Sequence, residues 1–404
     1  MIHTYSLAGY GQMIVDAKRT AGYREALRQA VNPGAVVLDI GTGIGMFALL
    51  ACQCGAKRVY AIDPSNCIDL ARELAAANGY AERIHFIQDL STRITLPEPV
   101  DVIVSDLHGS LPFFQHIIPT IVDARQRFLA PGGRLIPQED TLWATVVALP
   151  EVYGKHTSAW KEDVYGLDLR AARPLAINQN YPALVTPEDI MAPAQCWWTL
   201  NFYTVAEPDA RREITWTTDR AGTAHGIVLW FDALLAPGVS FSNRPGESPG
   251  VYASYFFPWP EPVNLEAGDV VSVDLAANLV GDNYLWRWDT RILELGHPGR
   301  VKAEFRQSTF FGAPVSSRSL AQRADGHVPV LSKDGQIDRF ILELMDGKNS
   351  LAEIARQVTA QFPARFAGEN EALAKVGDLS LEYGQPLDCK YLRESQKGGM
   401  NVTV

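Results

Sequence analysis

The chain has 404 residues, 47% of them hydrophobic, so it is long enough to bury more than one core. Its 36 basic and 46 acidic residues give a net charge of -10 without a clustered basic stretch, which argues against a nucleic-acid partner. Five cysteines without zinc-type spacing predict reduced thiols and no metal site. Because there is neither a secretory signal nor an apolar run of membrane-spanning length, we expect a cytoplasmic protein with no membrane partner.

The first third of the chain alternates short apolar runs with amphipathic stretches, which predicts parallel strands joined by helices. The expected strands are Val36–Ile40, Arg58–Ile62, Ile84–Ile87 and Val100–Ser105. Helices are expected at Met46–Cys54 and Cys67–Asn78, each closed by a glycine. A turn at Leu129–Gly133 then leads to a strand at Arg134–Ile136. The pattern predicts a doubly wound, Rossmann-like α/β domain over residues 1–138.

A glycine-rich turn follows the first expected strand. It contains Gly41, Thr42, Gly43 and Gly45, and glycines there let a ligand approach the backbone closely. Asp39 precedes the turn, where its carboxylate can meet the amino group of a methionine moiety. Asp63 ends the second strand, where an acid can accept both hydroxyls of a ribose.

These features favour S-adenosylmethionine as the cofactor and S-adenosylhomocysteine as its product. A nicotinamide-binding turn is the alternative, but the glycine spacing departs from the usual dinucleotide fingerprint. Asp89, Leu90 and Ser91 follow the third strand, where an adenine edge is usually held, although turn residues are an equally simple interpretation for such a segment. Asp106 ends the fourth strand and is a candidate for the methyl-transfer end.

After Pro137 the sequence pattern changes to strand-like segments separated by proline and glycine, which predicts an antiparallel β domain over residues 139–310. Residues 159–195 are less strand-like and are expected to form a helical excursion. Helical spacing returns near Ser332, and Ser350 with Glu353 forms a capping box. A small helical or winged-helix module is therefore expected over residues 325–388, followed by a polar tail at 389–404.

Several stretches in chain order resemble the protein arginine N-methyltransferase family, over roughly residues 5 to 305. They are Met13–Thr20, Val37–Asp63, Arg127–Pro137, Trp160–Asp168 and Phe202–Val205. The resemblance implies a methyltransferase domain followed by a β-barrel, with a helical dimerisation arm at residues 159–195. It also implies a homodimer, a peptide or protein substrate, and a role for Arg19 in holding the carboxylate of the cofactor.

The acceptor segment departs from the family pattern. Family members carry two glutamates that clamp a guanidinium. Here the corresponding positions are Asp106 and Gln115, and an imidazole, His108, lies between them. We therefore expect Asp106 to orient or activate the nucleophile and Gln115 to hydrogen-bond the acceptor. His108 is either a general base or a loop histidine without a chemical role.

The segment from Asp334 to Ala355 resembles the small winged-helix modules related to the pyrroloquinoline-quinone peptide chaperone, which bind leader segments of precursor peptides. A stabilising helical lid is the alternative. The leading hypothesis is thus a methyltransferase acting on a peptide or protein, with ribosomally made natural-product precursors as candidates and an acceptor pocket altered from the arginine type. Peptidyl-arginine N-methylation is the second hypothesis, and a catalytically silent peptide-binding dimer is the third.

Overall fold

The computed structural model describes residues 6–109, 111–161, 165–247, 250–297 and 299–385. It divides into two compact units, Met1–Pro314 and Val315–Val404. The methyltransferase and β-barrel domains predicted from the sequence both fall in the first unit, and the C-terminal module falls in the second. Each unit is described by itself.

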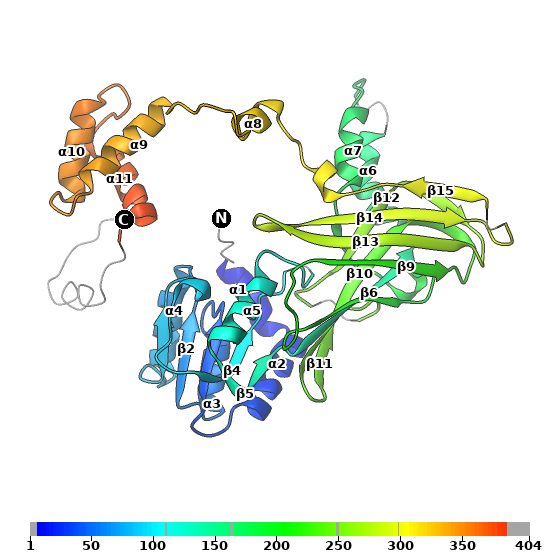
Figure 1. Ribbon diagram of the computed structural model, residues 1–404, viewed down its shortest axis with the longest axis horizontal. Helices are drawn as coiled ribbons and strands as arrows, with labels where there is room; N and C mark the ends of the chain where they lie inside the picture. The colour runs from blue at the N-terminus through cyan, green and yellow to red at the C-terminus, as the bar shows by residue number, and fades with distance from the viewer. Residues whose placement is uncertain (1–5, 110, 162–164, 248–249, 298, 386–404) are drawn as a thin grey trace. The chain divides into compact units, whose positions relative to one another are not determined.

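The first unit begins with a five-stranded parallel sheet of order β3-β2-β1-β4-β5 (Figure 1). Its strands are β1 Val36–Ile40, β2 Arg58–Ile62, β3 Ile84–Ile87, β4 Val100–Ser105 and β5 Leu129–Ile136. The first four confirm the predicted ranges. The last begins earlier than expected, because Leu129 already pairs with Val100 and the predicted turn is absorbed as an irregularity within the strand pairing.

Helices connect the strands of this sheet. They are α1 Leu7–Val15, α2 Ala17–Ala30, α3 Met46–Gln53, α4 Cys67–Ala77 and α5 Ile117–Arg127. Gly55 and Gly79 adopt positive φ just beyond α3 and α4, as predicted for residues that end helices. The strand order reverses between β1 and β4, so right-handed crossovers place the connecting helices on both faces and leave a ligand-binding crevice at the carboxyl edge.

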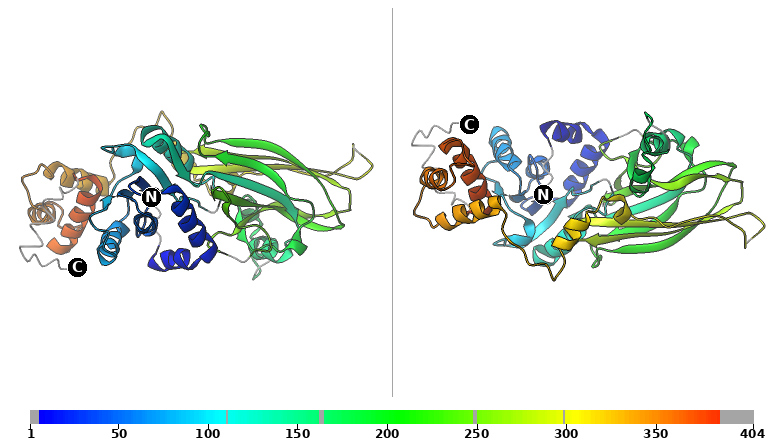
Figure 2. Two further views of the ribbon diagram at one scale, coloured as in Figure 1. Left: turned by 90° about the horizontal axis from the view of Figure 1, so that it is seen from below. Right: turned by 90° about the horizontal axis from the view of Figure 1, so that it is seen from above.

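Two antiparallel sheets form the barrel-like domain, and their strands run alongside one another in Figure 2. One sheet contains β7 Tyr181–Ala183, β12 Ser254–Leu265, β10 Gly222–Ala236, β6 Glu139–Val147 and β8 Gln195–Asn201, with β11 Val239–Ser242 paired to β10. The other contains β15 Val301–Phe305, β14 Asn283–Leu293, β13 Val270–Val280 and β9 Ala210–Thr217. Four fully buried tryptophans fill the core: Trp197, Trp216, Trp259 and Trp288.

The helical excursion differs from its predicted bounds of 159–195. It starts with α6 Pro150–Thr157, continues through the 3-10 turns η2 Ser158–Trp160 and η3 Arg170–Ala172, and ends with α7 Arg173–Ile177. Proline at the first helical turn explains the early start. Residues 181–183 already belong to the barrel, because they pair with the edge of β12. Figure 1 shows α6 and α7 side by side, projecting from the strands.

The parallel-sheet domain and the barrel-like domain share one hydrophobic core. Tyr23 on α2 stacks on Phe47 on α3 with ring centroids 4.4 Å apart, and it also contacts Phe241 on β11. Arg125 on α5 donates to the carbonyls of Phe202 and Val205 at 2.6 and 2.8 Å. The carboxyl edge of the parallel sheet is therefore held against the barrel strands.

The second unit contains α8 Ser317–Gln322, α9 Lys333–Leu344, α10 Leu351–Gln361 and α11 Glu369–Tyr383. The last three pack around a core that includes Ile341, Ile354 and Val376. The predicted capping box of Ser350 and Glu353 is confirmed at the start of α10. No strand occurs between residues 315 and 385, so the described part of this module is helical and shows no wing. The predicted tail at 389–404 lies outside the described residues.

Candidate active site

The glycine turn after β1 has the backbone conformation that its sequence predicts. Gly41, Gly43 and Gly45 have φ values of 73°, 55° and 86°, which side chains rarely adopt. A Cβ atom on Gly41 would lie 2.5 Å from Leu107 Cδ2, and one on Gly43 would lie 2.6 Å from Tyr10 Cε1. Glycine is therefore required at both positions, because the side chains of Leu107 and Tyr10 lie directly against the turn.

Asp39, at the end of β1, is fully buried beneath this turn. The hydroxyl of Thr42 donates to Asp39 Oδ2 at 2.6 Å, whereas Asp39 Oδ1 has no hydrogen-bond partner among the described residues. Burial raises the pKa of Asp39 to about 7, although the Thr42 hydrogen bond opposes the shift. An unpaired buried carboxylate oxygen costs free energy, so this atom is suited to a donor supplied by a ligand.

Asp63, at the end of β2, ties two loops together. Its Oδ2 accepts from the Gly43 backbone N–H at 2.8 Å, and its Oδ1 accepts from the Ser65 backbone N–H and hydroxyl at 2.9 and 2.5 Å. The structure thus places Asp63 against the glycine turn, and its predicted role toward a ribose stays a prediction. The same edge continues after β3, where Asp89 accepts from the Leu90 backbone N–H and the Ser91 carbonyl accepts from Arg127.

Arg19 on α2 lies beside the turn with its guanidinium over the rings of Tyr23 and Phe47, at 5.5 and 5.2 Å from their centroids. It is 7% exposed. Its Nε donates to Asp106 Oδ2 at 2.5 Å, and its Nη2 is ion-paired with the same oxygen. Phe47 lies in the helix that follows the glycine turn, so Arg19 stands between the turn and the predicted acceptor end.

Asp106 follows β4 and is the centre of a buried charge cluster. Its Oδ1 accepts from the Tyr252 hydroxyl at 2.7 Å and lies 2.9 Å from His108 Nδ1. Burial alone would raise the pKa of Asp106, but Arg19 and His108 outweigh it and hold that pKa below its usual range. Burial and the neighbouring Asp106 raise the pKa of Tyr252, so its hydroxyl stays protonated and donates.

His108 bridges two carboxylates. Its Nε2 lies 2.7 Å from Asp140 Oδ2, in addition to its contact with Asp106. Burial opposes protonation, but the two carboxylates raise the pKa of His108 to about 10. Both ring nitrogens are therefore protonated and occupied at neutral pH, and this arrangement does not suit His108 to the role of a general base.

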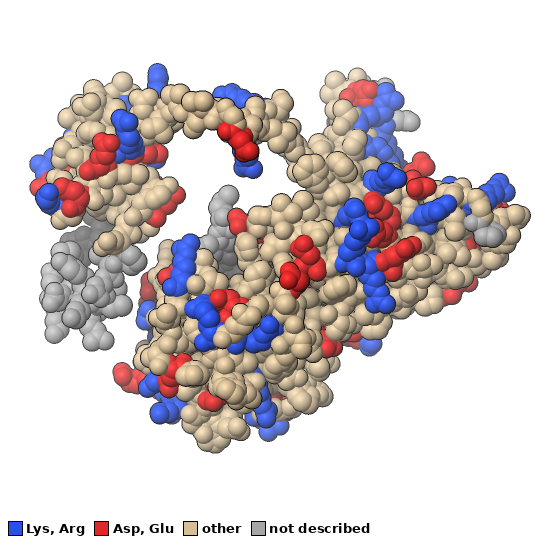
Figure 3. All heavy atoms as spheres, viewed as in Figure 1, with Lys and Arg blue, Asp and Glu red and all other residues tan. Residues whose placement is uncertain are grey.

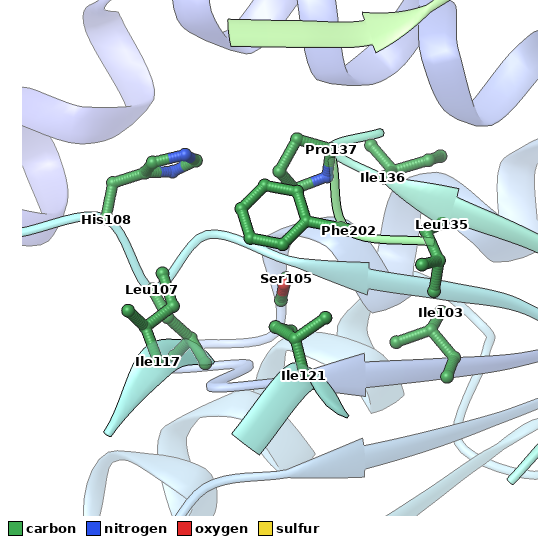
Figure 4. A pocket seen from close by; sticks show the side chains of 10 residues that line it. All are labelled: Ile103, Ser105, Leu107, His108, Ile117, Ile121, Leu135, Ile136, Pro137 and Phe202. Atoms are coloured by element: carbon green, nitrogen blue, oxygen red, sulfur yellow. The ribbon is translucent and has the colours of Figure 1, made fainter. Parts of the chain in front are cut away.

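Gln115 is not brought into this cluster by a hydrogen bond. It adopts a φ of 43° at the end of the acceptor loop and is half-buried, but within the described ranges its side chain bonds to neither Asp106 nor His108. His108 also lines a small cavity, whose other walls are mainly apolar side chains (Figure 4). Its lining residues are Ile103, Ser105, Leu107, His108, Ile117, Ile121, Leu135, Ile136, Pro137 and Phe202.

Sequence reasoning missed Asp140 and the contact of Tyr252 with the acceptor carboxylate. Asp140 lies on the same face of β6 as Leu142, Ala144 and Val146, and all four side chains are fully buried. An acid on the inward face of a predicted strand is the signal that points to it, because buried acids need partners. Among the described residues, no group of three or more His, Cys, Asp or Glu side chains is arranged to hold a metal ion.

Comparisons with known protein families divide the first unit as its fold does. The family of ribosomal protein L11 methyltransferases (PrmA) matches residues 18–137, and the arginine methyltransferase oligomerization subdomain matches residues 138–284.

In the described ranges, no helix is long and apolar enough to cross a membrane. Basic and acidic side chains are interspersed on the face shown in Figure 3.

Individual relatives agree with this division. The probable protein arginine N-methyltransferase 6 of Arabidopsis thaliana is 30% identical over 261 residues, 61% of this chain, which spans 57% of that protein. Protein arginine N-methyltransferase 1 of Dictyostelium discoideum is 26% identical over 67% of this chain and 81% of its own length.

Solved structures show the same fold at low sequence identity. The Trypanosoma brucei PRMT1 enzyme–prozyme complex with AdoHcy has a TM-score of 0.67 at 21% identity, over 74% of this chain and 96% of that chain. Arabidopsis thaliana protein arginine methyltransferase 10 has a TM-score of 0.66 at 22% identity, over 75% and 97%. The first unit therefore has the fold of the protein arginine methyltransferases, and its sequence is similar to theirs over both of its domains.

Proposed function

We propose that this protein transfers a methyl group from S-adenosylmethionine to a guanidinium nitrogen of an arginine side chain in a peptide or protein. The observation that carries the proposal is Asp106, a buried and ionised carboxylate at the carboxyl edge of the sheet that already holds a guanidinium, that of Arg19. A carboxylate that pairs with one guanidinium has the charge and geometry to orient another. The names of the relatives favour the same acceptor.

The residues of the glycine turn fit the cofactor. Asp39 would offer its buried oxygen to the amino group, Asp63 would accept the ribose hydroxyls, and Gly41 and Gly43 would let the cofactor approach the backbone. Arg19 lies close enough to the turn to pair with the carboxylate of the cofactor, and the segment from Asp89 to Ser91 would border the adenine. Bound S-adenosylmethionine would supply an electrophilic methyl group.

The chain's own contribution to the reaction is positioning. Asp106 would orient the guanidinium while one nitrogen attacks the methyl carbon in line. The carbon–sulfur bond would break, S-adenosylhomocysteine would leave, and the proton lost by the nitrogen would pass to solvent. Tyr252 and His108 hold Asp106 from one side. Gln115 would hydrogen-bond the acceptor as a neutral group, so the clamp has one carboxylate.

A second acceptor class is favoured by a specific observation. His108 adds a positive charge beside Asp106, and Gln115 adds no negative charge. Both reduce the negative charge that a cationic acceptor needs, which favours a neutral acceptor in a peptide, including a ribosomally made natural-product precursor.

Labelled cofactor distinguishes the two acceptors. The protein is incubated with labelled S-adenosylmethionine and either an arginine-rich peptide or the same peptide with every arginine replaced by glutamine. Label confined to the arginine peptide, and located on a guanidinium by mass spectrometry, supports the proposal. Equal labelling of both peptides would favour the neutral acceptor and count against arginine.

We further propose that the protein is a homodimer that works in the cytoplasm. The match to an oligomerization subdomain supports the dimer, as do Tyr165 and Leu167 between η2 and η3, which are 98% and 59% exposed. The free thiols of Cys52, Cys54 and Cys67 fit a reducing compartment.

The helical module of residues 333–383 is proposed to bind a leader segment of the substrate peptide. Leu351 and Leu373, 41% and 38% exposed, are available to an apolar segment. A chain ending at Pro314 should then methylate short peptides normally and lose its preference for a full-length precursor. An unchanged preference would instead support the alternative of a stabilising lid.

A further inference from the structure

His108 is enclosed on all sides by residues from both domains of the first unit. Its side chain is 1% exposed, and its ring stacks on Phe231 at a centroid distance of 5.2 Å and an interplanar angle of 7°. Phe241 and Tyr252 pack edge-on against it at 6.3 and 6.0 Å. Such an environment leaves hydrogen bonding as the only way to satisfy both ring nitrogens.

Titratable groups face His108 from three elements. Asp106 comes from the loop after β4, Asp140 from β6, and the Tyr252 hydroxyl from the segment before β12. Arg19 and Tyr23 lie behind Asp106, and Glu139 adjoins Asp140. The two carboxylates in direct contact are therefore the groups that fix the charge of the ring.

Among the described residues, the side chain of Asp140 has no hydrogen-bond partner other than His108. It is fully buried, its Oδ2 contacts His108 Nε2, and its Oδ1 has no partner among the described residues. Burial raises the pKa of Asp140, and His108 opposes that shift. A buried ion pair contributes little net stability compared with apolar residues of the same size. An acid at this position is thus better explained by what it does to His108.

The hydrogen bonds of Asp106 differ between its two oxygens. Oδ1 accepts from His108 and from Tyr252, which uses both of its lone pairs. Oδ2 is the oxygen that faces a guanidinium, that of Arg19. The orientation of the Asp106 carboxylate, and therefore which oxygen meets a cation, depends on His108 as a donor.

We infer that Asp140 is a positioning residue: it keeps His108 charged, and His108 in turn fixes the Asp106 carboxylate through Oδ1, so that Oδ2 is the oxygen left to meet a guanidinium. This inference rests on the proposed function for the identity of the acceptor. The chain Asp140–His108–Asp106 itself is tested without any acceptor. It links a strand of the barrel domain to the acceptor loop of the methyltransferase domain.

The first experiment follows His108 by NMR in protein labelled at histidine. His108→Asn identifies its signal among those of the 8 histidines. In the wild type the signal should stay that of the charged ring from pH 6 to pH 9. In Asp140→Asn it should titrate within that range. The matched control is Asp232→Asn, on the neighbouring strand β10, whose carboxylate accepts from Trp143 Nε1 at 2.8 Å and should leave the signal unchanged.

Two NMR results would overturn the inference. One is a His108 signal that titrates near its ordinary value in the wild type. The other is a signal that titrates identically in the wild type and Asp140→Asn. Both measurements are independent of the acceptor, so they test the chain Asp140–His108–Asp106 even if no arginine peptide is methylated. A failure to methylate arginine peptides would reject the proposed function alone.

The second experiment measures methylation of the arginine peptide against pH. The rate of methylation by Asp140→Asn should fall roughly tenfold between pH 6 and pH 9, because one charge-assisted hydrogen bond is lost as His108 loses its proton. The fall should appear in kcat more than in KM. Affinity for S-adenosylhomocysteine should stay unchanged. In the double variant Asp140→Asn/His108→Asn the amide still donates but does not titrate, so the added pH dependence should vanish. A rate lowered equally at every pH would mean that Asp140 only supports the fold, and would overturn the inference.

Discussion

Replacing Asp39 with asparagine should have opposite effects on stability and on cofactor affinity. The pKa of Asp39 is about 7 in the folded protein against an ordinary value of 3.8, because the carboxylate is buried with one oxygen unpaired. A raised folded pKa destabilises the fold above the unfolded pKa. The loss grows as pH rises from 3.8 and is complete above about pH 7.

The magnitude follows from the size of the shift. At pH 5.5 the ionisable carboxyl costs about 2 kcal/mol, and at pH 8 about 4 kcal/mol, at 1.36 kcal/mol for each unit between the two pKa values. Asparagine escapes this cost but buries an amide donor, at about 1–3 kcal/mol that is independent of pH. The stability difference between Asp39→Asn and the wild type should therefore shift by about 2 kcal/mol in favour of the variant between pH 5.5 and pH 8.

Urea denaturation at the two pH values measures this shift, and calorimetry with S-adenosylhomocysteine measures affinity. Asp69→Asn, on the exposed side of α4 with its side chain 78% exposed, controls for the substitution itself. Asp39→Asn should bind S-adenosylhomocysteine at least about tenfold more weakly than the wild type, because the carboxylate proposed to meet the amino group is gone. A stability difference that is the same at both pH values would refute the reasoning.

Three further predictions follow from individual contacts. Gly43→Ala should weaken binding of S-adenosylhomocysteine by about tenfold in calorimetry, since the new Cβ meets Tyr10 at a φ of 55°; unaltered affinity would mean that the turn does not hold the cofactor. Tyr252→Phe should lower kcat about tenfold with unchanged cofactor affinity, because Asp106 loses a hydrogen bond of 2.7 Å, and a KM effect alone would contradict this. Tyr165→Asp should shift the protein from dimer to monomer in light scattering, since the exposed ring is proposed to lie in the interface; a persistent dimer would place the interface elsewhere.

The parallel sheet was predictable because its central strands β1, β2 and β4 are almost entirely buried and therefore stand out as short apolar runs. Glycines with positive φ marked the ends of α3 and α4 in the same way. The bounds of the helical excursion were not predictable, because residues 181–183 join the barrel only through pairing with a distant strand, β12. Helix α11 escaped prediction because the residue before it, Gly368, provides no capping side chain.

The same distinction applies to the site. The position of Asp39, Asp63 and Asp106 at one edge of the sheet was predictable, because each acid lies at the carboxyl end of a parallel strand, where open α/β folds bind ligands. Their roles stay predictions. Asp140 was not, because its role arises only when β6 packs against the loop after β4 and brings together residues that are 32 positions apart. That contact also altered the interpretation of His108, which was expected to be either a general base or a loop histidine without a chemical role, to that of a charged donor.

The most direct test of the central claim is the site of methylation on an arginine-rich peptide after incubation with labelled S-adenosylmethionine. The proposed mechanism predicts label on a guanidinium nitrogen with the wild type and none with Asp106→Asn, while both proteins still bind S-adenosylhomocysteine in calorimetry. Label on another atom, or undiminished arginine methylation by Asp106→Asn, would contradict it.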